Sequence, residues 1–140
     1  MHISFDPSTL RQSRLGSITG VVYFEFDQGR KFPSLGWNDF VVVVASWWIV
    51  ALKEIIEGAT EVKLRFMDGP YWIAVASQES KLLLRCIDDH QGGRILYDLP
   101  VELDDLVAEI FGFARKVSEA CMKAGISSAD LDRMRTALPN

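Results

Sequence analysis

The residues of this chain that could carry acid–base or metal chemistry lie in one short segment. Only two histidines are present, His2 and His90, and His90 directly follows Asp88 and Asp89. A histidine beside carboxylates can transfer protons or help to bind a metal ion. The segment 88–93, Asp-Asp-His-Gln-Gly-Gly, is equally typical of a hairpin loop, and no spacing in the sequence supplies further ligands. We therefore expect a turn here, with no metal and no cofactor.

The sequence contains no motif for nucleophilic catalysis or phosphate binding. Cys86 and Cys121 stand beside no base, and their strand-like and helix-like surroundings predict buried thiols. The glycine patterns of dinucleotide and phosphate loops are missing, as is the Gly-x-Ser-x-Gly elbow. Distant residues can still assemble a catalytic cluster, but the sequence favours a protein that is not an enzyme.

Acidic residues are concentrated where the last predicted strand leads into a helix. No Lys or Arg occurs between Arg94 and Arg115, a stretch that holds five carboxylates. Carboxylates at a helix start complement the helix dipole, which explains part of this run. The remainder can form an acidic face that attracts a basic protein. The predicted partner-binding residues combine this face with two turns: Asp68, Gly69, Tyr71, Asp88, Asp89, His90, Asp98, Glu102, Asp104 and Asp105.

Composition narrows the class of partner. The chain has 140 residues, the size of a single domain, and a net charge of −4 that disfavours nucleic acid as a ligand. A hydrophobic content of 49% leaves little polar surface to cover the core. We therefore expect a protein partner or a homodimer formed through an apolar patch.

The longest apolar segment, residues 40–56, predicts a helix rather than a strand. Asn38 or Asp39 can cap its start, and Gly58 can end it. It contains Trp47 and Trp48, which point about 100° apart on a helix, so only one of them can centre on the core. The uncharged part of this segment is too short to cross a membrane.

Alternation of polar and apolar residues predicts the strands. One strand covers residues 18–26, and four more follow the helix in a meander that ends near Asp98. Pro100 is expected to start a helix that reaches Gly125, and a last short helix ends near Leu138. The fold class is therefore α+β, with a five-stranded, mostly antiparallel sheet whose helices pack mainly on one face.

The first residues predict a flexible start and no leader. Residues 1–15 are polar, and they lack the basic region and apolar core of a signal peptide. Nothing in the sequence demands an oxidising compartment, so we expect a cytoplasmic protein.

Several aromatic and turn motifs resemble those of small bacterial immunity proteins, the partners of polymorphic or contact-dependent toxins. They are Phe32-Pro33, the segment 36–40 (Gly-Trp-Asn-Asp-Phe), Trp47-Trp48 and the segment 66–71 (Phe-Met-Asp-Gly-Pro-Tyr). The resemblance covers roughly residues 18 to 98 and implies an acidic protein that neutralises a cognate toxin, such as a basic toxin domain, by direct binding. The alternative is a small enzyme or ligand-binding domain with a pocket between the Trp-rich helix and the sheet, near Trp47, Trp72 and Tyr97.

Overall fold

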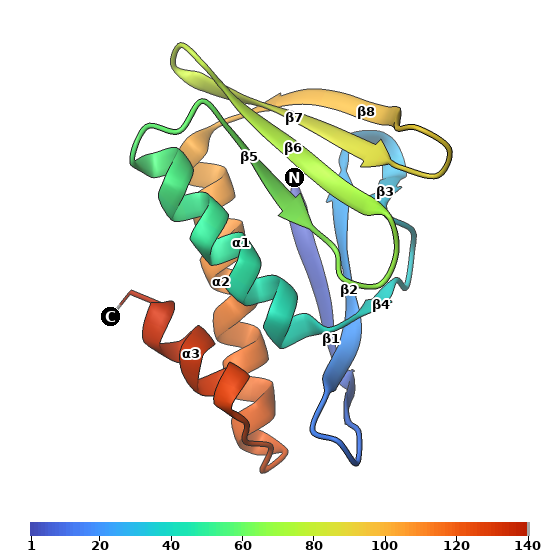
Figure 1. The fold of residues 1–140 in the computed structure, drawn as a ribbon, viewed down its shortest axis with the longest axis vertical. Helices are drawn as coiled ribbons and strands as arrows, with labels where there is room; N and C mark the ends of the chain where they lie inside the picture. Colours follow the sequence, from blue (N-terminus) through green and yellow to red (C-terminus); the bar gives the residue numbers. More distant parts are fainter. Residues whose placement is uncertain (140) are drawn as a thin grey trace.

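Two antiparallel sheets and a group of three helices make up the fold (Figure 1). The computed structural model describes residues 1–139. In chain order the elements are β1 (His2–Gln12), β2 (Ile18–Phe26), the 3-10 turn η1 (Asp27–Gly29), β3 (Arg30–Phe32), β4 (Asn38–Asp39), α1 (Val41–Ile56), β5 (Glu61–Arg65), β6 (Tyr71–Gln78), β7 (Lys81–Asp88), β8 (Arg94–Val101), α2 (Leu103–Lys123) and α3 (Ala129–Ala137). The predicted α+β class is confirmed.

The strands divide into two four-stranded sheets, and not into the single five-stranded sheet expected. In the first sheet β2 pairs with β1 along one edge and with the short strands β3 and β4 along the other. The second sheet is the predicted meander, in the order β5-β6-β7-β8. The sequence predicted too few strands because β1, β3 and β4 show no clear alternation of polar and apolar residues. The meander also continues through Pro100, which lies in β8 and does not begin the next helix.

The N-terminal segment was expected to be flexible, and this is wrong for residues 2–12, which form β1. Ile3 and Leu10 are buried. The carboxylate of Glu109 in α2 accepts hydrogen bonds from the backbone N–H of Ile3, at 2.7 Å, and contacts His2 Nδ1 at 3.0 Å. Pairing with β2 and these contacts to α2 hold a strand that is mostly polar in sequence.

Trp48 joins the sheets and helices into one core. Its side chain is 0% exposed, whereas Trp47 is 41% exposed, as the helical geometry of adjacent residues requires. The Trp48 ring contacts Phe24 of β2, Phe66 and Phe113 of α2, with centroid distances of 5.2–5.3 Å. Its indole N–H donates to the backbone carbonyl of Arg65 at 2.8 Å. This bond also fixes α1 beside β5, where Figure 1 shows the two lying together.

Candidate binding surface

Three loops that are far apart in the sequence meet at one end of the molecule. They are the loop before β4, the β5–β6 turn and the β7–β8 loop. The Trp37 ring lies 5.1 Å from the Tyr71 ring between centroids, and Tyr71 lies 5.5 Å from His90. The backbone N–H of Asp89 donates to the carbonyl of Pro70 at 2.8 Å. We call this region the three-loop surface and define it by Leu35, Trp37, Met67, Asp68, Gly69, Tyr71, Asp88, Asp89 and His90.

A fully buried carboxylate, that of Asp39, holds two of the loops together. It accepts hydrogen bonds from four N–H groups: the Trp37 indole at 2.9 Å, and the backbones of Phe40 at 2.7 Å, Met67 at 3.2 Å and Asp68 at 3.2 Å. A buried carboxylate is costly unless it is fully hydrogen-bonded. Asp39 therefore fixes the β5–β6 turn against the start of α1.

The same residue corrects a prediction about the helix start. Asn38 or Asp39 was expected to cap α1, but Phe40 occupies the N-cap position and its side chain makes no capping bond. The Asp39 side chain instead points to a turn 28 and 29 residues further along the chain. Bonding across that distance leaves no local sequence signal, so the role of Asp39 was missed.

Gly69 allows the turn to approach Trp37 closely. Its φ is +126°, a conformation that L side chains rarely adopt. A Cβ atom at this position would lie 3.1 Å from both the Trp37 and the Tyr71 ring. The glycine is thus needed for both backbone conformation and space.

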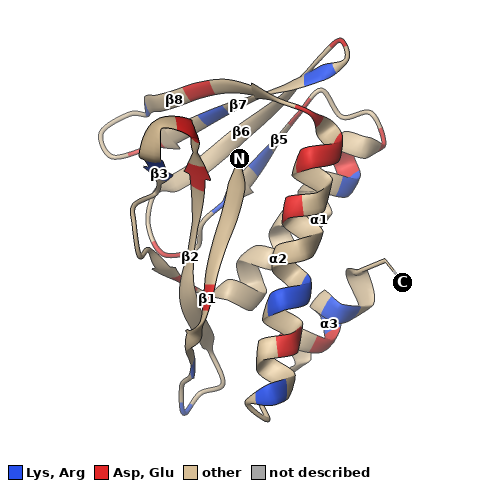
Figure 2. Cartoon of the chain, turned by 180° about the vertical axis from the view of Figure 1, so that it is seen from behind, with Lys and Arg blue, Asp and Glu red and all other residues tan. Residues whose placement is uncertain are grey.

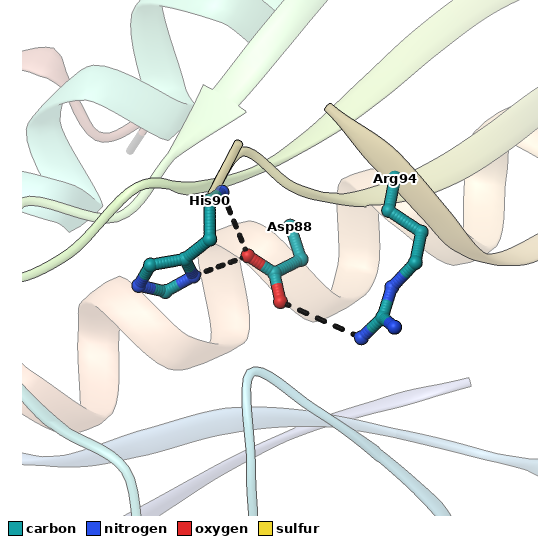
Figure 3. Close-up of polar contacts among 3 residues, drawn as sticks. All are labelled: Asp88, His90 and Arg94. Carbon is teal, nitrogen blue, oxygen red and sulfur yellow. Dashed lines mark hydrogen bonds and ion pairs between the residues drawn. The ribbon is translucent and has the colours of Figure 1, made fainter. Parts of the chain in front are cut away.

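The β7–β8 loop is ordered by Asp88, which lies between His90 and Arg94 (Figure 3). One carboxylate oxygen accepts from the backbone N–H of His90 at 3.0 Å and contacts His90 Nδ1, and the other faces Arg94 Nη2 at 3.8 Å. The hydrogen bonds from His90, first from its backbone and then from its side chain, lower the pKa of Asp88. His90 and Arg94 are exposed and Asp88 is half-buried between them, and their bonds serve the turn, as the hairpin-loop interpretation predicted.

The three-loop surface combines exposed apolar and acidic side chains. Leu35 is 71% exposed and Met67 is 47% exposed. Asp68, Asp89 and His90 are also exposed, whereas Trp37 and Tyr71 are half-buried beneath them. Large apolar groups on a fixed backbone beside charged groups are characteristic of protein interfaces.

The remaining predicted residues lie elsewhere, so the ten candidates do not form one face. Asp98 projects from β8 and faces Arg85 of β7 at 3.7 Å. Glu102, Asp104 and Asp105 cluster at the start of α2, which Figure 2 shows as an acidic region. Glu102 and Asp105 line a pocket of about 200 Å³ with Phe26, Asp27 and Lys81, and Lys81 Nζ lies 3.5 Å from Glu102. The structure thus brings together six of the ten residues and separates the other four.

The aromatic residues proposed for a ligand pocket do not converge. Trp47 lines a groove of about 290 Å³ between α1 and β5, together with Val50, Lys63 and Arg65. Trp72 is not among the residues that line it, and its ring is covered by Lys63 Nζ at 4.8 Å. Tyr97 faces the first sheet, 6.2 Å from Phe26 between ring centroids.

The two cysteines are buried free thiols, as predicted. Burial raises the pKa of Cys86 to about 12, with a smaller opposing effect from Arg30, and it also raises the pKa of Cys121. A thiol with a raised pKa is a poor nucleophile at neutral pH. Within residues 1–139, no three His, Cys, Asp or Glu side chains are grouped so that they could hold a metal ion. In the same part of the chain, every helix is too short or too polar to span a bilayer.

Comparison of the chain with protein-family models, curated proteins and solved structures finds no match. The resemblance to immunity proteins therefore stays a prediction from the sequence motifs.

Proposed function

We propose that this protein is a noncatalytic binding module that meets another protein through the three-loop surface. The observation that carries the proposal is the Asp39 carboxylate, which fixes the loop before β4 and the β5–β6 turn beneath exposed Leu35, Met67 and Asp68. A surface ordered before binding loses less conformational entropy when the partner docks.

We propose that the partner is a basic protein. More specifically, we propose that the partner is a bacterial toxin and that this protein inhibits it in the cytoplasm. Asp68 and Asp89 contribute carboxylates at the rim of exposed apolar groups, an arrangement that attracts a basic partner and then excludes water. The resemblance of segments 36–40 and 66–71 to immunity proteins supports the same class. Those segments contain Asp39 and Gly69, whose contacts build the three-loop surface.

The test is a capture experiment with two double variants that change charge equally. Tagged wild-type protein, Asp68→Lys/Asp89→Lys and Asp104→Lys/Asp105→Lys are each incubated with native cell lysate, and retained proteins are identified by mass spectrometry. We expect a small basic protein to be retained by the wild type and by the 104/105 variant, but lost from the 68/89 variant. Equal retention by both variants would contradict binding through the three-loop surface.

Inhibition is tested separately, with the captured protein itself. If it is a toxin, its expression alone stops growth, and coexpression with the wild type restores growth while coexpression with Asp68→Lys/Asp89→Lys does not. Rescue by both would assign protection to another surface. A partner that is harmless when expressed alone would leave a binding module without the toxin-inhibitor role.

A further inference from the structure

The outer face of the second sheet is left uncovered by the rest of the described chain. Its inner face carries Val62, Leu64, Ile73, Val75, Leu84 and Cys86, which are buried against the core. The alternate residues of the same strands point away from α1 and the first sheet. Among residues 1–139, the helix that packs extensively against this sheet is α1, which lies beside β5. The outer face is therefore open to a partner. Figure 2 marks basic residues on β5 and β7.

The strand register arranges this face in rows. One row is Arg65, Trp72, Ile87 and Ile95; the next is Lys63, Ala74, Arg85 and Asp98; the third is Glu61, Ala76, Leu83 and Pro100. In the last two rows β6 carries the small residues Ala74 and Ala76 where β7 carries the long residues Arg85 and Leu83; Ala74 is only 6% exposed between its neighbours, and Ala76 is half-buried. Ile95 on β8 is 54% exposed. The face is thus a surface of raised and lowered strips that contains both apolar groups and charges of both signs.

We propose that this outer face packs against the outer face of a second copy of the chain, giving a homodimer. A twofold axis parallel to the strands, between β6 and β7, places β6 of each copy over β7 of the other and β5 over β8. Each row of residues then faces the same row of the second copy. Ala76 then lies opposite Leu83 of the second copy, a small residue facing a long one, and Trp72, whose ring Lys63 covers, lies opposite Ile87.

Charge complementarity supports the same arrangement. Lys63 of one copy lies opposite Asp98 of the other, and the symmetry repeats this pair on the far side of the interface. Asp98 already faces Arg85 of its own chain at 3.7 Å, so each Asp98 would have a cation on both sides. Charges inside an interface are tolerated when they are paired in this way.

The axis direction has a consequence for the ends of the dimer. Rotation about an axis parallel to the strands keeps the β5–β6 and β7–β8 loops of both copies at the same end. The dimer would therefore present two three-loop surfaces side by side. The dimer proposal does not depend on the function proposed for those loops, because its contacts lie on the outer face of the sheet.

The first test is the mass of the full-length protein in solution, measured by analytical ultracentrifugation over a series of concentrations. We expect twice the mass of one chain. Ala76→Glu should raise the dissociation constant by on the order of 100-fold, because it places unpaired carboxylates opposite Leu83. The matched control is Met122→Glu, at a 70% exposed residue near the C-terminal end of α2, away from the sheet face, which should leave the mass unchanged. A wild type that stays monomeric, or an equal effect of both variants, would overturn the proposal.

The second test fixes the register of the contact without any variant that weakens it. Ala76→Cys and Leu83→Cys proteins are prepared separately, mixed and oxidised. The proposal expects a disulfide-linked dimer in the mixture that contains one chain of each kind, and little from either protein alone. Linkage of each variant to itself, or none in the mixture, would exclude this geometry. Wild-type protein that copurifies with nucleic acid or with another protein on this face, instead of a second copy, would also overturn the proposal.

Discussion

The two ends of the molecule that carry the predicted acidic residues are built in different ways. At the three-loop end, the buried carboxylate of Asp39 accepts four hydrogen bonds and ties together segments on both sides of α1. At the start of α2, Asp104 and Asp105 are exposed. The same residue type thus fixes a backbone in one place and supplies solvated charge in the other. The difference lies in burial and in the number of N–H partners.

The largest effect that tests this difference is expected from Asp39→Ala. The change leaves the Trp37 indole and the N–H groups of Met67 and Asp68 without their acceptor. We expect the free energy of unfolding to fall by about 3–5 kcal/mol, measured by urea denaturation. A fall in the free energy of unfolding of less than about 1 kcal/mol would show that water can replace the carboxylate as hydrogen-bond acceptor. Asp39 would then contribute no more to stability than the exposed carboxylates at the start of α2.

Gly69→Ala should have the next largest effect. The added methyl group meets Trp37 and Tyr71 at 3.1 Å in a backbone conformation that alanine disfavours, so we expect a loss of about 1–3 kcal/mol. Gly36→Ala is the control, since Gly36 also has a positive φ, +73°, but nothing lies within 4 Å of its Cβ position. Equal losses in the two variants would mean that the close contact contributes nothing.

Asp104→Ala should cost much less than either change. Asp104 lies in the first turn of α2 and is exposed, so its removal forfeits only its interaction with the helix dipole, about 0.3–1 kcal/mol. The loss should shrink in high salt, which screens this interaction. A larger loss that is independent of salt would indicate that the α2 end is fixed in the way that Asp39 fixes the other end.

His90→Ala should produce the smallest change, a shift in the titration of Asp88. The pKa of Asp88 is lowered by the folded loop, so this carboxylate stabilises the fold at higher pH and the contribution is lost as the pH falls through the lowered pKa. The variant loses the side-chain hydrogen bond but keeps the bond from the backbone N–H of residue 90. We expect the pKa of Asp88 to rise part of the way to its ordinary value, measured by carbon NMR of the carboxyl group. An unchanged pKa would remove His90 from the ordering of this loop.

The elements with strong local patterns could be predicted from the sequence. Alternation marked β2 and the meander, and the apolar run with Gly58 after it marked α1. The strand β1 was not recognisable because only Ile3 and Leu10 among its residues are buried, and its pairing with β2 is irregular between Asp6 and Arg11. Division of the strands into two sheets depends on pairing partners, which no local pattern specifies.

The site was predictable in part for the same reason. Turn composition identified Asp68, Gly69 and the segment 88–90, and a turn exposes its side chains wherever it lies. Convergence of these turns with Trp37 depends on Asp39 and on the bond between Asp89 and Pro70, contacts between residues that are distant in sequence. Asp98, Glu102, Asp104 and Asp105 were grouped with the turns because all are acidic, and charge type alone does not place residues on one surface.

The hydrogen bonds of the Asp39 carboxylate also join the two ends of the chain segment 39–68. Both ends of this segment contact the Asp39 side chain, and α1 and β5 lie between them. The turn at residues 57–60, which connects α1 to β5, lies at the opposite end of this segment from Asp39. In this turn Gly58 has a φ of +108° and open space around it. Extra length inserted at that turn can be absorbed without moving either tied end. This turn is therefore the place for a fluorescent label or an affinity tag that must report on docking without disturbing it.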